Sequence, residues 1–341
     1  MSLPTPAADA PALEAPAPAT PARQRRQPPA RFAVLGLLGL LILLFSALRP
    51  DTFATTDNAS TILLENAVLT MLALAVMVPL IANDFDLSVA SVLGLASMLA
   101  AGLPARQGFS AGMTIVAILL MGLAVGLVHA GLIVGLGLPS FVVTLGTNSV
   151  LGGLIILYSD GAVIYQGIPE AISALGTSEV FGIGLPIVFV VVLAGALWYV
   201  LEQRPAGRLL YAVGASEAAS RLAGVRTARV RALALIAASV IAAFAGLILT
   251  ARVGSASPTS YTAFFLPAFA AAFLSLAAFR LGHYNPLGVV VSVYLLAVGV
   301  TGLALLGVPS WVEPVFNGGA LVVAIALSRL TSGAMRRIDV P

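Results

Sequence analysis

The chain contains no cysteine and no lysine, and both absences restrict its chemistry. Without Cys it forms no disulfide and offers no thiolate to a metal ion. Because all 17 basic residues are Arg, there is no lysine for a phosphate-binding P-loop, a Schiff base or an ammonium nucleophile. The only two histidines, His129 and His283, lie far apart in the sequence. We therefore predict no catalytic site, no metal site and no cofactor in this polypeptide.

Charged residues are also scarce, at 9% of the chain, whereas hydrophobic residues make up 60%. A soluble domain carries about 25% charged residues, so this chain lacks the polar side chains needed to cover a water-exposed surface. Its mean hydropathy of +1.05 fits a lipid environment. We expect an all-α, polytopic integral membrane protein, which excludes an enzyme that works in water. The basic residues lie between apolar runs, where they set membrane orientation, so they do not indicate nucleic-acid binding.

Apolar runs along the chain predict about ten transmembrane helices. Residues 1–31 are rich in Pro and Ala, and we expect a disordered cytoplasmic tail there. The membrane domain is predicted over 32–328 and a cytoplasmic tail over 329–341. A signal peptide is the alternative for 32–48, but no convincing small-x-small cleavage site follows. The predicted spans are 32–48, 62–81, 87–103, 111–136, 138–157, 181–201, 232–251, 263–279, 287–307 and 312–328.

The distribution of Arg residues gives these spans an orientation. With ten spans and a cytoplasmic N-terminus, only Arg49, Arg106 and Arg252 of the 17 Arg fall outside. This is the imbalance that the positive-inside rule describes. It predicts that both termini are cytoplasmic. The run 87–103 is left open, because it is either a full span or a re-entrant half-helix.

Two short segments resemble each other. Gly137-Leu-Pro-Ser-Phe-Val142 is similar to Gly307-Val-Pro-Ser-Trp-Val312, and each enters a predicted span from an opposite side of the membrane. That arrangement is typical of an inverted repeat of two halves, which places a pathway at the interface between them. A chance match of six residues is the alternative.

The longest cytoplasmic loop, 202–231, predicts a short helix between two spans. Gly214 is expected to break the chain, Ser216 to cap the helix and Glu217 to match the positive end of its dipole. Gly224 is expected to end it. Alone in water a helix of about two turns is marginal, so it either docks into a groove on a partner or belongs to a solvated loop. Its other small or charged residues are Ala218, Ala219, Arg221 and Ala223.

This loop resembles the coupling loop in permease subunits of bacterial ABC importers for monosaccharides of the ribose, xylose and arabinose type. In that family a small-residue helix after Tyr-Ala-x-Gly, here Tyr211–Gly214, docks into the ATP-hydrolysing subunit. Further family motifs appear in order over roughly residues 60–330. They are Asp86-Leu-Ser-Val89, Leu138-Pro-Ser-Phe141 with Thr144-Leu-Gly-Thr147, Gly254-Ser-Ala-Ser-Pro258 and Asn317-Gly-Gly319.

The chain departs from the family pattern at three places. Ala90 stands where the family has Gly, and Asn83-Asp84-Phe85 stands where it has Gly-Gly-Ile. Leu274–His283 replaces a Gly-rich stretch. These departures bear on the substrate and the pathway, and not on the fold.

Polar side chains at membrane depth are functional candidates because an unpaired polar group in lipid is costly. Asp84 and Asp86 either line a polar vestibule and bind sugar hydroxyls, or cap the helix that follows. Thr144, Thr147 and Asn148 share one helical face by their spacing and either face the pathway or hydrogen-bond another helix.

Other polar or small residues favour structural roles. His129 is expected to be a packing residue, with a proton relay as the alternative. Gly122 and Gly126 form a small-xxx-small pattern that predicts close helix packing. Glu65 and Asn66 are expected at the membrane interface.

The resemblance implies a permease subunit in the bacterial inner membrane that carries a sugar or sugar-like solute. Its implied partners are an ATP-binding ABC subunit, a second permease copy or a relative, and an extracytoplasmic solute-binding protein, with membrane lipid around it. The coupling residues would be Gly214, Ser216, Glu217, Ala218, Ala219, Arg221 and Gly224, and the pathway residues Asp84, Asp86, Ser88, Thr144, Thr147 and Asn148.

Three alternatives stay open. A permease of the same superfamily could carry nucleosides, branched-chain amino acids or a sugar-derived signal. An ion-coupled secondary transporter could use Asp84, Asp86 or His129. An intramembrane enzyme is the weakest alternative, because the spans offer no paired His and carboxylate and no Ser–His arrangement.

Overall fold

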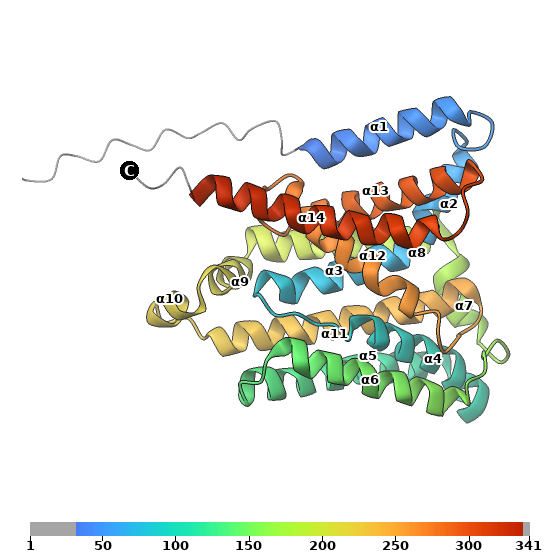
Figure 1. The fold of residues 1–341 in the computed structure, drawn as a ribbon. Coiled ribbons are helices and arrows are strands. Elements are labelled where there is room, and N and C mark those ends of the chain that lie inside the picture. The colour runs from blue at the N-terminus through green and yellow to red at the C-terminus, as the bar shows by residue number, and fades with distance from the viewer. Residues whose placement is uncertain (1–31, 337–341) are drawn as a thin grey trace, which may run out of the picture.

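The computed structural model describes residues 32–336, which form a bundle of helices (Figure 1). The predicted tail over 1–31 lies outside the described residues, as does the 337–341 part of the predicted C-terminal tail. The first half of the bundle contains α1 (Ala33–Leu48), α2 (Thr56–Glu65), α3 (Ala67–Ile81), α4 (Val89–Gln107), α5 (Ala111–His129), the π-helix η2 (Ala130–Gly135), α6 (Ser140–Ser159) and α7 (Glu170–Thr177).

The second half begins with a small antiparallel hairpin, in which Glu179 pairs with Gly184. The elements that follow α7 are β1 (Glu179–Val180), β2 (Ile183–Gly184), α8 (Leu185–Trp198), the π-helix η3 (Tyr199–Gln203), α9 (Pro205–Ala215), α10 (Glu217–Leu222), α11 (Thr227–Val253), α12 (Thr262–Leu274), the 3-10 helix η4 (Ser275–Ala277), α13 (Pro286–Leu305) and α14 (Val312–Arg336).

The helix lengths confirm an all-α, polytopic membrane protein. Within the described residues, 6 helices are long and apolar enough to cross a membrane, and α2 with α3 makes up to 7. α1, α12 with η4, and the first part of α14 are apolar but shorter. The count of ten spans stays a prediction. The run 87–103, which was left open, is the continuous 19-residue helix α4.

The predicted span 62–81 is interrupted near its start and comprises the end of α2 and all of α3. α2 and α3 meet at Asn66 with a bend of about 40°. The side-chain amide of Asn66 donates a hydrogen bond to the Ile62 carbonyl at 2.9 Å. Asn side chains compete in this way with the backbone ladder of a helix, which explains the break. The helix also starts earlier than predicted, because the Thr55 hydroxyl caps it by accepting from the Asn58 N–H.

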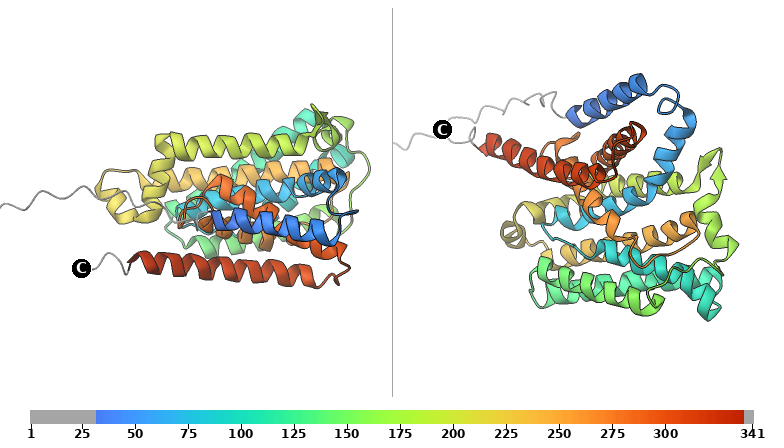
Figure 2. Two further views of the ribbon diagram at one scale, coloured as in Figure 1. Left: turned by 90° about the horizontal axis from the view of Figure 1, so that it is seen from above. Right: turned by 45° about the vertical axis from the view of Figure 1, so that its right-hand side comes forward.

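Three helices form the centre of the bundle. All 15 residues of α3 are buried, and α4 and the long α11 pack against it (Figures 1 and 2). The contact between α4 and α11 is close at Gly246, where a Cβ atom would lie 2.2 Å from the Leu93 carbonyl oxygen. By contrast, only 22% of the residues in the most apolar stretch of α5 with η2, of α6 and of α8 with η3 are buried within the chain. They are the helices that lipid or another subunit would cover.

The two ends of the bundle differ. The start of α1, the end of α14 and the pair α9–α10 lie at one end (Figure 1). α6 also begins there, because the Ser140 hydroxyl accepts a hydrogen bond from the backbone of Phe85 and neighbouring Asn83 bonds to α9. α14 begins at the opposite end. Both helices follow a glycine with positive φ, Gly137 and Gly307. This geometry fits the two similar segments, and the inverted repeat stays a prediction.

The small-xxx-small pattern on α5 is a site of close helix packing, as predicted. A Cβ atom on Gly126 would lie 2.6 Å from the Ile236 Cα on α11. One on Gly122 would lie 2.7 Å from the Ala243 Cβ. These two glycines therefore set the distance between α5 and α11.

Replacing Gly126 by Val should destabilise the protein, because the added side chain meets backbone atoms that cannot move aside. Overpacking of this kind typically costs about 1–3 kcal/mol. The measurement is the thermal unfolding midpoint of the purified chain in lipid nanodiscs. Gly112→Val is the matched control, because a Cβ on Gly112 of the same helix meets nothing within 4 Å. Equal midpoints for the two variants would contradict this packing.

Candidate functional site

Arg231, near the start of α11, pairs with two carboxylates from different parts of the chain. Its Nε and Nη2 donate to the two carboxylate oxygens of Asp84 at 2.9 and 2.8 Å. Its Nη1 donates to Glu217 Oε2 at 3.1 Å. The Asp84 side chain is 3% exposed and that of Arg231 is 21% exposed. A planar guanidinium with a fork of donors suits this bidentate contact and still has a donor left over for a second acid.

The two carboxylates belong to different structural units. Asp84 lies in the connection between α3 and α4, and Glu217 is the first residue of α10. Glu217 also accepts hydrogen bonds from Arg221 at 2.9 Å and from the Thr227 hydroxyl at 3.2 Å. Arg231 therefore ties the short helix α10 to the buried α3–α4 connection. We call Asp84, Glu217 and Arg231 the arginine link.

The charge around Glu217 affects its ionisation. Partial burial alone would raise the pKa of this carboxyl. The attraction of Arg231 and the hydrogen bonds from Arg221 and Thr227 outweigh burial, so the net pKa is lowered. Glu217 is thus ionised at neutral pH and holds its partners as a charged group.

The local structure of α10 follows its sequence closely. The Ser216 hydroxyl caps the helix by accepting from the Ala219 N–H at 3.2 Å. Gly224, just beyond its end, has φ of +81°, which an L side chain rarely adopts. The prediction for Gly214 is wrong in one respect, because α9 continues through it to Ala215. Its lack of a side chain serves close packing instead, since a Cβ there would lie 1.8 Å from the Ile81 carbonyl oxygen.

One face of α10 is held by the protein and the other is free. Ser220 is buried, whereas Ala218, Ala219 and Leu222 are exposed. Leu222 is 91% exposed, which is unusual for a large apolar side chain on a helix that the protein holds so firmly. Ala218, Ala219 and Leu222 together give α10 a small apolar free face, of the kind that a helix presents to a groove on a partner.

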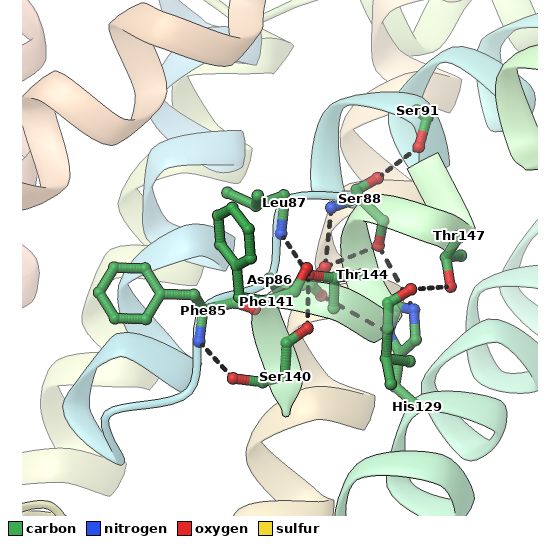
Figure 3. Close-up of polar contacts among 11 residues, drawn as sticks. Phe85, Asp86, Leu87, Ser88, Ser91, His129, Ser140, Phe141, Thr144 and Thr147 are labelled. Atoms are coloured by element: carbon green, nitrogen blue, oxygen red, sulfur yellow. Dashed lines mark hydrogen bonds and ion pairs between the residues drawn. The ribbon is translucent and has the colours of Figure 1, made fainter. Parts of the chain in front are cut away.

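A second set of polar residues, at the start of α6, holds the extended segment between α3 and α4 (Figure 3). The Thr144 hydroxyl accepts from the Leu87 N–H at 3.1 Å and lies 3.0 Å from the Phe85 carbonyl oxygen. The Ser140 hydroxyl accepts from the Phe85 N–H at 3.1 Å. These contacts satisfy backbone groups that no helix pairs, which a buried segment requires. They fix the segment to the first turns of α6.

Asp86 in this segment is buried and bonds to Ser88, the residue before α4. Its Oδ1 accepts from the Ser88 N–H at 3.0 Å and from the Ser88 hydroxyl at 2.6 Å. Its Oδ2 has no hydrogen-bond partner and lies 3.7 Å from His129 Nδ1, which also has none. Both side chains are fully buried. Oδ1 thus bonds to Ser88, the residue before α4, whereas the first turn of α4 has no side-chain cap. The role of Asp86 stays a prediction, with His129 packed against it.

The residues that the sequence predicted for a pathway therefore fall into two groups, one buried and one half-buried. Asp84, Asp86, Ser88 and Thr144 are buried in contacts within the chain. Thr147 donates its hydroxyl to the Val143 carbonyl, and Asn148 is half-buried. Their assignment to a pathway stays a prediction. In the described part of the chain no cluster of three or more His, Asp or Glu side chains is arranged to hold a metal ion.

Sequence reasoning missed two residues of this site. Arg231 was counted only as one of the cytoplasmic positive charges, because its partner Asp84 is 147 positions away. Leu222 was part of the predicted short helix, but nothing in the sequence shows that it points away from the protein. Its position opposite the buried Ser220 becomes clear only when the helix is docked.

Comparison with known proteins gives a family. The family described as the permease component of branched-chain amino acid transport systems matches residues 58–325. The D-allose transport system permease protein of Escherichia coli is 28% identical over 304 residues, which cover 89% of this chain and 92% of that protein. The ribose import permease protein of Bacillus subtilis is 31% identical over 303 residues, 87% of this chain and 92% of that protein.

A second ribose import permease protein, from Haemophilus influenzae, is 30% identical over 290 residues, 84% of this chain and 89% of that protein. No solved structure gives a significant match.

Replacing Arg231 by Met should destabilise the protein by about 3–5 kcal/mol, because it leaves the buried Asp84 carboxylate without its partner. Arg229→Met is the matched control, since Arg229 is exposed on the same helix. The measurement is the thermal unfolding midpoint in nanodiscs. Adding Asp84→Leu to the Arg231→Met variant should recover part of the loss, because it removes the unpaired charge. A double variant no more stable than Arg231→Met would contradict this explanation.

Proposed function

The chain belongs to the family of permease components of branched-chain amino acid transport systems, and from that premise we propose that it is the membrane-spanning subunit of an ATP-driven ABC importer. The relatives named for allose and ribose favour a sugar or a sugar-like solute as the cargo. Members of this family are transport permeases, and this chain is a multi-pass membrane protein. The observation that carries the proposal is the anchored helix α10 with its exposed apolar face.

In this proposal α10 is the site where an ATP-binding subunit docks. The exposed Ala218, Ala219 and Leu222 fit a helix-in-groove contact, in which small residues allow close approach and one apolar side chain fills a pocket. Because the chain has no lysine, it has no P-loop of its own, and ATP hydrolysis belongs to the separate subunit. The end of the bundle that contains α9 and α10 is then cytoplasmic, together with both termini.

The arginine link would transmit a movement of α10 to the helices inside the membrane. When the ATP-binding subunits close, they displace α10, and Glu217 carries the displacement to Arg231. Arg231 in turn holds Asp84 through two hydrogen bonds, so the α3–α4 connection moves with it. That connection is fixed to α6 through Thr144. Movement of α10 therefore changes the packing among α3, α4, α6 and α11, which would switch a pathway between the two faces.

The family also favours two further partners in this proposal. A solute-binding protein would deliver the cargo at the end opposite α10, and a second permease, either this chain or a relative, would complete the pathway. The poorly buried helices α5, α6 and α8 provide apolar surface for lipid or for that second subunit.

Replacing Leu222 by Asp should abolish docking of the ATP-binding subunit, because a charge would enter an apolar pocket. The measurement is the amount of ATP-binding subunit that co-purifies with the tagged chain, together with ATP-driven uptake in proteoliposomes. Phe181→Asp is the matched control, since Phe181 is 100% exposed in the hairpin at the other end of the bundle. It should leave co-purification unchanged.

Two results would contradict the proposal. In the first, Leu222→Asp and Glu217→Arg both retain the ATP-binding subunit and normal uptake. In the second, the chain purifies alone and still moves solute in liposomes along an ion gradient. The second result would favour the ion-coupled transporter and direct attention to Asp86 and His129.

A further inference from the structure

A cavity of about 350 Å³ is lined by residues from several helices. Those parts of the helices lie at the end of the bundle away from α10, where α14 begins (Figure 1). The cavity is bounded by the junction of α2 and α3, by α12 and α13, and by the first two turns of α14. None of the residues that were predicted to line a pathway contributes to it. Its volume is at the small end of the range for ligand sites, about 300–1,000 Å³, and suits a small solute.

The cavity is polar for a site inside an apolar helical bundle. Five polar side chains line it, and they come from three separate segments of the chain: Glu65, Asn66, Thr301, Glu313 and Asn317. Among the contacts of the described residues, only the Asn66 side-chain nitrogen has a hydrogen-bond partner, the Ile62 carbonyl. Asn317 is buried and Asn66 and Thr301 are half-buried, whereas Glu65 and Glu313 are exposed. The other polar atoms are available to a ligand.

Asn317 is the most informative of the five. It is only 7% exposed, yet its side-chain amide forms no hydrogen bond with any described residue. Because the Asn317 amide lines the cavity and has both a donor and an acceptor, it pairs fully with a ligand that supplies both.

The lining restricts the chemistry of that ligand. No Arg or His contributes to the cavity, so an anion has no charged partner there. Carboxylates accept hydrogen bonds, and the amides and the Thr301 hydroxyl both donate and accept. This set matches a neutral molecule with several hydroxyl groups. Phe264 and Pro267 of α12 supply an apolar wall for the carbon skeleton of such a molecule.

The break between α2 and α3 also points to this place. Glu65 and Asn66 lie at the bend itself, and α3 starts there without a side-chain cap. Interrupted helices in transporters commonly carry the substrate site, because their ends offer polar backbone groups at membrane depth. The bend therefore also brings Glu65 and Asn66 to the wall of the cavity.

We propose that this cavity is a transient binding site for a neutral polyhydroxylated solute of monosaccharide size, which it accepts at the extracytoplasmic end of the permease. The proposal rests on the proposed importer function, because that function places this end of the bundle outside the cytoplasm. Asn317 and Glu313 are the groups that contact solute hydroxyls. Thr301 and Asn66 are positioned to complete the set of hydrogen bonds.

The test measures binding of radiolabelled D-ribose and D-allose to the full chain in nanodiscs, and uptake of a panel of pentoses and hexoses by the assembled importer. Asn317→Leu and Glu313→Leu should each weaken binding by about tenfold, the effect of losing one or two good hydrogen bonds. Glu313→Gln should weaken it far less, because Gln keeps an acceptor. Glu170→Leu, an exposed acidic residue on α7, is the matched control and should have no effect.

Folding is checked separately, by the yield of each variant and by its co-purification with the ATP-binding subunit. Wild-type sugar uptake combined with unchanged binding and uptake in Asn317→Leu and Glu313→Leu would overturn the cavity proposal and leave the importer function intact. Failure of the wild-type importer to take up any sugar would overturn the function itself. Saturable binding of Na⁺ that Glu313→Gln abolishes, without sugar binding, would identify a cation site and overturn the polyol proposal.

Discussion

The pairing of one arginine with two carboxylates is the constraint on which the rest of this account depends. A buried carboxylate such as Asp84 is tolerated only with an ionic or hydrogen-bonded partner. Arg231, near the start of α11, is that partner, and its Nη1 donates a further hydrogen bond to Glu217. The requirement to neutralise one buried charge therefore also places the short helix α10. One side chain therefore both neutralises a buried charge and positions the helix that we propose as a docking surface.

The backbone of the α3–α4 connection imposes a second constraint. An extended segment inside a helical bundle must satisfy its N–H and C=O groups without a neighbouring strand. Ser140 and Thr144 at the start of α6 do this for Phe85 and Leu87. Asp86 accepts a hydrogen bond from the N–H of Ser88, the last residue before α4. The segment is therefore held on one side by α11 and on the other by α6, so a displacement of α10 reaches both.

Much of the fold could be predicted from hydropathy, because long apolar runs become helices wherever they fall. The starts of α1, α6 and α13 lie within two residues of their predicted positions. The bend at Asn66 could not be predicted, because the Asn66 side chain could equally have bonded to water. In the structure it bonds to the Ile62 carbonyl of the helix backbone. The cap at Ser216 was predictable because it is local. The partners of Arg231 were not, because they meet only after distant helices pack. Likewise, the cavity beside Asn317 depends on three segments that no sequence pattern connects.

The most direct test of the arginine link is hydrogen exchange on the full chain in nanodiscs, comparing wild type with Arg231→Gln and Arg229→Gln. The account predicts that Arg231→Gln raises exchange together in two segments, residues 83–88 and 217–223, while α5 is unchanged. Arg229→Gln should leave both segments as in wild type. If Arg231→Gln loosens residues 217–223 but leaves 83–88 protected, the two segments are not linked through this side chain, and the proposed route from α10 into the membrane is wrong.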